Sequence, residues 1–159
     1  MMATNPKSLS ESIERITAED YPQVVDVWER SVRATHHFLT ESDITEIKPL
    51  VQGELENLAN VFCIRDQDRK VAGFVGFDHG KLEALFVDPS WHRAGIGRRL
   101  CDYALKFGDA MLVDVNEDNQ QAIDFYLHIG FTVEGRSEVD SAGRPFPLLH
   151  LRYDLFATK

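Results

Sequence analysis

The sequence has few cysteines and no long apolar run, and each shortage excludes a class of protein. Cys63 and Cys101 are too few for a framework of disulfides, and they form no CxxC motif. No apolar run approaches the ~18 residues that suggest a membrane span. Residues 1–12 lack the apolar segment of a signal peptide, and we interpret them as a flexible leader. We therefore expect a cytoplasmic protein without a membrane partner.

Basic residues are also scarce: 17 lysines and arginines stand against 26 aspartates and glutamates, and the formal net charge is -9. This balance argues against a nucleic-acid partner and is compatible with a cationic or amine partner. The hydrophobic fraction of 43% and the length of 159 residues are those of one ordinary globular domain. We expect residues 13–159 to form that domain, as a monomer or a homodimer.

A strand, a loop and a helix follow one another between residues 85 and 107. The apolar run 85–87 is stopped by Asp88-Pro89, which predicts a buried strand that ends in a turn. From residue 96 the apolar positions recur every three or four residues, so we expect one face of a helix over 96–107, Phe107 included. Gly108 stands where a C-cap glycine is expected.

The loop before this helix carries Gly95 and Gly97, among the basic side chains of His92, Arg93, Arg98 and Arg99. Free helix amides and the helix dipole favour a phosphate group at such a junction. The glycine spacing fits neither the dinucleotide fingerprint nor the P-loop. The alternative is a tight turn with a solvated basic rim.

Read in order, the chain predicts the element order βααβββαβαββ, which is an α/β fold with a mixed sheet and helices on both sides. Thr17 and Thr40 or Ser42 are placed to begin the first two helices, and Pro49 predicts a kink or a break in the second. The turn 116–119 precedes the last helix. The expected strands cover residues 12–16, 60–65, 70–77, 81–87, 111–115, 131–138 and 148–155.

Two motifs resemble those of the GNAT superfamily of acyl-CoA-dependent N-acetyltransferases. Val87-Asp88-Pro89 followed by Gly95-Ile96-Gly97-Arg98 is similar to motif A, with His92 where the family has Gln or Arg. The run Asn119, Ala122, Phe125-Tyr126 and Gly130-Phe131 is similar to motif B. The element order matches the GNAT fold. Residues 31–36, 38–39, 135–140 and 147–149 also resemble one small bacterial member of the family.

This resemblance implies that acetyl-CoA lies between two splayed strands, 82–87 and 111–115. Backbone groups of Phe86 and Val87 would bond the pantetheine, and amides from Arg93 to Arg98 would take the pyrophosphate. The cofactor-binding residues would be Leu85, Phe86, Val87, His92, Arg93, Ala94, Gly95, Ile96, Gly97, Arg98, Asn116, Asn119 and Tyr126.

Tyr126 matches the general acid of the family and would protonate the leaving thiolate; the alternative is a core tyrosine. Glu83 stands where some members carry a glutamate base, and the alternative is a solvated or paired carboxylate. His36, His37 and Phe38 would border the acceptor pocket, although adjacent histidines are often surface residues. We expect no metal site, because adjacent histidines cannot easily share one ion and no third ligand is evident.

The sequence therefore predicts an N-acetyltransferase that moves the acetyl group of acetyl-CoA to a primary amine, a protein lysine or a small amine. Direct attack in a ternary complex is expected, because no nucleophilic triad is visible in the sequence. The alternative is a non-catalytic acyl-CoA-binding or regulatory module, against which the retained Tyr126 weighs.

Overall fold

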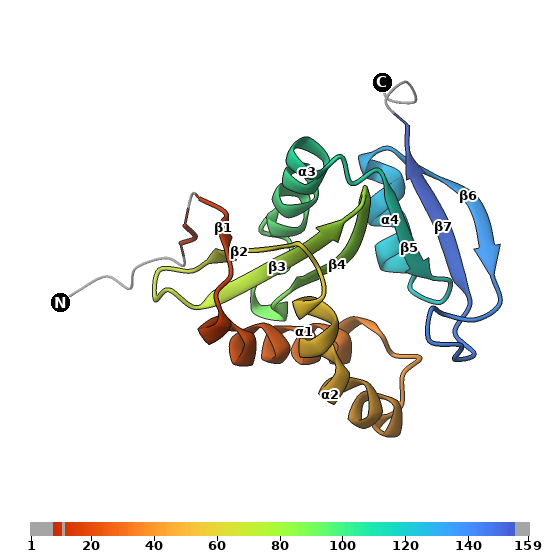
Figure 1. Cartoon of the computed structure of the whole chain (residues 1–159), viewed down its shortest axis with the longest axis horizontal. Coiled ribbons are helices and arrows are strands. Elements are labelled where there is room, and N and C mark those ends of the chain that lie inside the picture. Colours follow the sequence, from red (N-terminus) through yellow and green to blue (C-terminus); the bar gives the residue numbers. More distant parts are fainter. Residues whose placement is uncertain (1–7, 11, 155–159) are drawn as a thin grey trace.

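The computed structural model describes residues 8–10 and 12–154, which form one mixed seven-stranded sheet with helices on both faces (Figure 1). The strand order is β1-β2-β3-β4-β5-β7-β6, and the predicted element order is confirmed. Among the strands of the described residues, β4 and β5 are the only parallel neighbours. The strands are β1 (Glu14–Arg15), β2 (Asn60–Arg65), β3 (Val71–Asp78), β4 (Lys81–Val87), β5 (Leu112–Asn116), β6 (Phe131–Ser137) and β7 (Leu148–Tyr153). The helices are α1 (Tyr21–Thr35), α2 (Glu41–Glu56), α3 (Ile96–Gly108) and α4 (Gln120–Ile129), with short 3-10 turns η1 (Ala18–Asp20) and η2 (Pro89–Trp91).

Two hydrophobic cores lie on opposite faces of the sheet. On one face, α1 and α2 cover β2 and β3 through buried side chains such as Val24, Ile44 and Phe74. On the other face, α3 and α4 pack against β3 to β7 through residues such as Leu100 and Ile123. The sheet is therefore fixed from both sides. Among the described residues, no helix combines the length and the apolar character needed to cross a bilayer.

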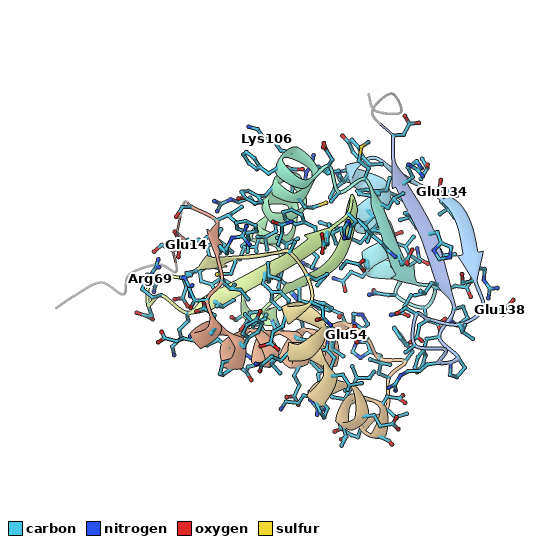
Figure 2. All side chains as sticks on the ribbon, viewed as in Figure 1. Glu14, Glu54, Arg69, Lys106, Glu134 and Glu138 are labelled. Atoms are coloured by element: carbon cyan, nitrogen blue, oxygen red, sulfur yellow. The ribbon has the colours of Figure 1, made fainter. Side chains whose placement is uncertain are left out.

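The start of α1 is fixed by a capping box and by a buried ion pair. Thr17 and Asp20 form the expected box ahead of the helix. Both carboxylate oxygens of Asp20 also accept hydrogen bonds from Arg65 of β2, at 3.1 and 3.0 Å, and this guanidinium holds the pKa of the carboxyl below its usual range. Glu14 of β1 accepts bonds from Arg65 and Arg69 (Figure 2). The network ties β1, α1 and the β2–β3 turn together.

The second helix runs from Glu41 to Glu56 without interruption, so of the two outcomes expected at Pro49, a kink or a break, the break does not occur. Ile44 near its start and Leu55 near its end are both buried in the same core. Packing of both ends compensates for the hydrogen bond that proline removes from the middle of a helix. The start at Thr40 is as expected, because its side chain accepts from the Asp43 amide at 3.0 Å.

The two ends of the chain are described only in part. Within the predicted leader, Leu9 pairs with Asp66 and the Ser10 amide donates to the Arg65 carbonyl at 2.7 Å. The rest of that leader, residues 1–7 and 11, lies outside the described residues, and so does residue 155 of the expected last strand. Within the described residues, the last strand, β7, ends at Tyr153.

Phe107 lies on the helix face of Tyr103, with 4.7 Å between the tilted rings, and is 64% exposed. One expectation for the end of α3 is wrong: Gly108 is still helical, and Asp109 (φ 47°) takes the left-handed position after it. The glycine has a packing role instead, because a Cβ at position 108 would lie 2.3 Å from the Phe77 ring.

We predict that Gly108→Ala destabilises the protein by about 1–3 kcal/mol, because an extra carbon against a buried aromatic ring overpacks the core. The matched control is Gly53→Ala in α2, where a Cβ meets nothing within 4 Å. That change should stabilise the fold by about 0.5–1 kcal/mol through higher helix propensity. Urea unfolding of both variants measures the difference, and equal effects would contradict the packing role of Gly108.

Candidate active site

Strands β4 and β5 separate after two residue pairs. Lys81 pairs with Leu112 and Leu82 with Val113, and the parallel pairing ends there. Strand β4 continues along β3 to Val87, whereas β5 continues along β7 to Asn116. The sheet thus divides into β1–β4 and β5–β7, as Figure 1 shows. We call this opening the β4–β5 split; it leaves the β5-facing backbone groups of β4 without a strand partner in the described chain.

A β-bulge lies in β4 at the split. Ala84 pairs with Gly76 and Leu82 with Phe77, so Glu83 has no partner on β3. The extra residue changes which side chains face which core: Leu82 packs with α3 and α4, and Ala84 packs on the face of α1 and α2. Glu83 itself is exposed.

The loop from β4 to α3 presents unoccupied helix amides. Arg93 (φ 69°) and Gly95 (φ 81°) both adopt left-handed geometry, and Gly95 is the N-cap of α3. It supplies no side-chain cap, and the Arg99 amide makes the first bond of the helix, to the Gly95 carbonyl. The amides of residues 96–98 therefore point from the positive end of the helix dipole, which suits an anion.

Asp88 anchors the start of this loop from three directions. Its amide donates to the Ala72 carbonyl of β3 at 2.8 Å. Its carboxylate is buried, accepts from the amide and hydroxyl of Ser90 at 2.9 Å, and forms an ion pair with Arg30 of α1. The loop is thereby fixed to the sheet and to α1.

A cleft of about 430 Å³ runs along this loop and along the end of β4 beyond the last β5 pair. Its walls come from α1, β4, the loop, the start of α3 and α4. The lining residues are Ser31, Thr35, His36, Leu85, Phe86, Val87, Trp91, His92, Arg93, Gly95, Ile96, Gly97, Arg98, Asn119, Gln121, Ala122, Phe125 and Tyr126.

Tyr126 is held in this cleft by its neighbours. The residue is 6% exposed, and its ring meets Phe125 and Phe131 edge-on at 5.0 and 5.4 Å. Burial, and beside it the thiol of Cys101, raise the pKa of the phenol. Because Tyr126 lines the cleft, a ligand in the cleft can meet its hydroxyl.

His36 and Asn119 meet across the cleft, with 3.2 Å between Nε2 and Nδ2. The Asn119 Oδ1 accepts from the Ala122 amide, so its Nδ2 donates to Nε2. On the other side, the Thr35 hydroxyl donates to the Ser31 carbonyl at 2.8 Å, so His36 Nδ1 must donate to that hydroxyl, also at 2.8 Å. His36 is thus neutral with its proton on Nδ1. Burial, and next His37, lower its pKa to about 4.

The structure places most of the candidate cofactor residues in one cleft. Ala94 and Asn116 do not line it, and neither do Glu83, His37 and Phe38. His37 is exposed, whereas the Phe38 ring lies 5.4 Å from that of His36 and 6.0 Å from that of Phe146. Among the described residues, no group of three side chains could hold a metal ion.

The sequence analysis missed six lining residues: Ser31, Thr35, Trp91, Gln121, Ala122 and Phe125. Three of them had a local signal, because Trp91 precedes the paired glycines and Ala122 and Phe125 belong to the second motif. Phe125 packs on the start of α3, where a Cβ at Gly97 would lie 3.4 Å from its ring. Ser31 and Thr35 had no such signal.

Comparison with known proteins agrees with this geometry. Residues 12–131 match the model of the Acetyltransferase (GNAT) family. The chain belongs to this family. The peptidyl-lysine N-acetyltransferase YjaB of Escherichia coli (strain K12) is 41% identical over 142 residues, which are 89% of this chain and 96% of that protein. YiaC, a peptidyl-lysine N-acetyltransferase of the same strain, is 32% identical over 116 residues, which are 72% of this chain and 78% of YiaC.

Solved structures of GNAT proteins share the fold. The solution structure of apo-form YjaB from Escherichia coli has a TM-score of 0.81 and 39% identity, and covers 89% of this chain and 96% of that one. The PaiA N-acetyltransferase from Thermoplasma acidophilum, in complex with coenzyme A, has a TM-score of 0.66 at 18% identity, with 92% and 99% of the two chains covered. The predictions of the GNAT fold, of an N-acetyltransferase and of a resemblance to one small bacterial member, YjaB, are confirmed.

We predict that the protein loses stability as the pH falls from 6.5 towards 4. In this range the unfolded chain binds a proton at His36 and the folded protein does not, because the folded pKa is lowered to about 4. The loss approaches ~3 kcal/mol, at ~1.36 kcal/mol per unit of pKa. Urea unfolding at several pH values should show this slope in the wild type and in His37→Gln, a change at an exposed neighbour. The slope should be smaller in His36→Gln, where only the loss from carboxylates such as Asp20 and Asp114 remains. An equal slope in His36→Gln and the wild type would contradict the neutral state of His36.

Proposed function

We propose that this GNAT protein transfers the acetyl group of acetyl-CoA to a primary amine, by direct attack of the amine on the thioester in a ternary complex. The observation that carries the proposal is that one cleft holds both the first amides of α3, those of residues 96–98, and Tyr126. The first feature suits a diphosphate, and the second suits the sulfur at the other end of the same cofactor.

The split supplies the rest of the cofactor site. Phe86 and Val87 of β4 line the cleft. The Phe86 carbonyl faces Gly73 of β3, whereas the backbone groups of Val87 face the β5 side and have no strand partner there, so a pantetheine amide can bond to Val87 in the manner of an added strand. The basic side chains of Arg93 and Arg98 also line the cleft and favour the phosphates. Main-chain amides of residues 93–98 would hold the pyrophosphate.

Tyr126 is the proposed general acid. Because its pKa is raised by burial, the phenol keeps its proton at neutral pH until a stronger base appears beside it. Burial also disfavours the charge of a departing thiolate, whose free thiol pKa is about 8.5, so the sulfur becomes a stronger base in the cleft than in water as the carbon–sulfur bond breaks. Proton transfer neutralises the buried leaving group.

The acceptor would reach the thioester from the side of the α1–α2 connection. His36 lines the cleft there, and Phe38 lies between His36 and Phe146. Since both ring nitrogens of His36 already have partners, we assign it a positioning role rather than that of a base. YjaB and YiaC are named peptidyl-lysine N-acetyltransferases, so a protein lysine is the proposed acceptor.

A lysine amine must lose a proton before it can attack. With a pKa of about 10.4, this costs roughly 4–5 kcal/mol at pH 7. Glu83 is one candidate base, because the bulge leaves it exposed beside the split.

We predict that Tyr126→Phe keeps its affinity for coenzyme A and loses kcat by roughly 100-fold or more, because only the proton donor is removed. Tyr103→Phe, in the aromatic cluster between α3 and strands β2 and β3, is the matched control and should keep wild-type values. Calorimetric titration with coenzyme A and a thiol-release assay with a lysine peptide measure the two quantities. Unchanged turnover in Tyr126→Phe would end the assignment.

We also predict that Gly95→Ala weakens coenzyme A binding by about tenfold, because an L side chain at φ 81° costs roughly 1–2 kcal/mol in the conformation that the amides need. Binding of pantetheine, which lacks the diphosphate, should change little. Gly143→Ala is a matched control, because it has the same left-handed geometry (φ 78°) and the same open surroundings in a distant loop. Titrations with both ligands test this, and equal losses for both would contradict the diphosphate site.

A further inference from the structure

Four polar side chains form one hydrogen-bonded chain across four strands. Lys81 Nζ of β4 donates to Asp114 Oδ2 of β5 at 2.6 Å. The other oxygen, Asp114 Oδ1, lies 2.6 Å from His150 Nδ1 of β7, and His150 Nε2 lies 2.6 Å from Ser137 Oγ of β6. The last three have the order of a serine–histidine–aspartate triad, although they come from separate strands and share no sequence motif.

Strand register produces this arrangement. His150 pairs with Asp114 on one side and with Gly135 on the other. Because Gly135 has no side chain, the imidazole can lie over it, and a Cβ there would be 3.5 Å from His150 Cδ2. The ring then reaches Ser137, the next residue of β6 on the same face. The chain is accessible, with side chains of Lys81 and His150 each 33% exposed and that of Asp114 24% exposed.

The direction of each hydrogen bond follows from the carboxylate. The bonds from Lys81 and His150 outweigh burial, which acts the other way, and lower the pKa of Asp114, so it is ionised and only accepts. His150 Nδ1 must therefore donate to it. In the neutral ring Nε2 is then an acceptor and takes the Ser137 hydroxyl proton. The lone pairs of Ser137 Oγ remain able to receive a proton from another group.

The chain of side chains lies at the β4–β5 split and on the acceptor side of the sheet. Asp114 is the first residue of β5 beyond the last β4 pair, Leu82 with Val113. Its side chain is on the face opposite the α3–α4 core, which contains its neighbours Val113 and Val115. Lys81 on β4 and Asp114 on β5 therefore bridge the base of the split.

The loop that follows Ser137 also leads to the acceptor side. It carries Arg144, which bonds Glu46 of α2 at 3.3 Å, and Phe146, which meets Phe38. In Figure 1 this loop after β6 lies beside the α1–α2 connection, and in Figure 2 Glu138 marks the end of β6 where the loop begins. Ser137 is thus placed where an acceptor amine would pass.

We propose that Ser137, His150 and Asp114 form the relay that deprotonates the acceptor amine. This inference rests on the proposed acetyltransferase function. The ammonium gives one proton to Ser137 Oγ while the Ser137 hydroxyl proton moves to His150 Nε2, and Asp114 stabilises the imidazolium through Nδ1. The neutral amine then attacks the acetyl carbon, the carbon–sulfur bond breaks, and Tyr126 protonates the thiolate. The second nitrogen proton restores Tyr126, and His150 releases the first proton to solvent.

Ser137 is the catalytic residue of this relay, and His150, Asp114 and Lys81 are positioning residues. The charged groups that face His150 are Asp114 from β5 and Lys81 beyond it. On its own strand, Arg152 points to the same face. Its charge is balanced by an ion pair with Glu134 of β6, in which Nε donates to Oε1 at 2.9 Å. From β6 the facing residues are Gly135 and the uncharged Ser137.

The test compares two acceptor peptides over pH 6–10 in the full-length protein: a lysine peptide, and the same peptide with S-aminoethylcysteine, whose side-chain amine is less basic. Ser137→Ala and His150→Ala should lower kcat for the lysine peptide by about 100-fold at pH 7. The loss should shrink as the pH approaches ~10.4, the pKa of the lysine amine. It should also be smaller for the less basic amine, while KM for acetyl-CoA stays unchanged. Ser137→Thr should keep most activity, and added imidazole should rescue His150→Ala.

Arg152→Gln is the matched control on the same face of β7 and should behave as the wild type. A loss in Ser137→Ala that is equal at every pH and for both peptides would mean a structural role and overturn the relay. A changed acidic limb in Glu83→Gln, with none in Ser137→Ala or His150→Ala, would assign the base to Glu83 instead. If the wild type releases no thiol with either peptide, the proposed function itself fails, and the relay fails with it.

Discussion

The parting of β4 from β5 is the constraint on which the rest of the site depends. Two parallel strands would normally continue to pair, but here each is held by its other neighbour: β4 by β3 as far as Val87, and β5 by β7 as far as Asn116. Helices α1 and α2 pack against the β1–β4 half, and α3 and α4 pack against both halves, so the strands cannot close again without unpacking a core. The cofactor cleft on one side and the exposed polar chain from Lys81 to Ser137 on the other both exist because the split stays open.

The loop after β4 turns this opening into a directional site. Asp88 is bonded to β3, to Ser90 and to Arg30 of α1, so the loop leaves the sheet at a fixed angle. Left-handed geometry at Arg93 and Gly95 then turns the chain into α3 with its first amides uncovered. Tyr126 of α4 stands in the same cleft. A ligand anchored at the α3 amides therefore has its other end directed to the tyrosine.

Local patterns in the sequence predicted most of the fold and most of the residues that line the cleft. Helix caps, the glycines before α3 and the second motif each depend on residues close together in the chain, and most of those residues lie where the patterns placed them. The acceptor side was not predictable in this way. His36 meets Asn119 83 positions away, and His150 meets Asp114 36 positions away and Ser137 13 away. These contacts depend on strand register and helix packing, which local patterns do not contain. The same holds for Gly108, whose missing side chain leaves room for the Phe77 ring and which does not cap the helix.

The different partners of His36 and His150 suit the two histidines to opposite tasks. His36 Nε2 accepts a hydrogen bond from the Asn119 side-chain amide, whose orientation is fixed by Ala122. A second proton on the ring would place two hydrogen-bond donors against each other and would break this bond. His150 Nε2 instead faces a hydroxyl, and its Nδ1 faces an ionised carboxylate. A proton arriving at Nε2 meets an oxygen that can turn to accept, and the positive ring gains an ion pair with Asp114. His36 is thus suited to a structural role in one protonation state, whereas His150 has the partners that proton transfer requires.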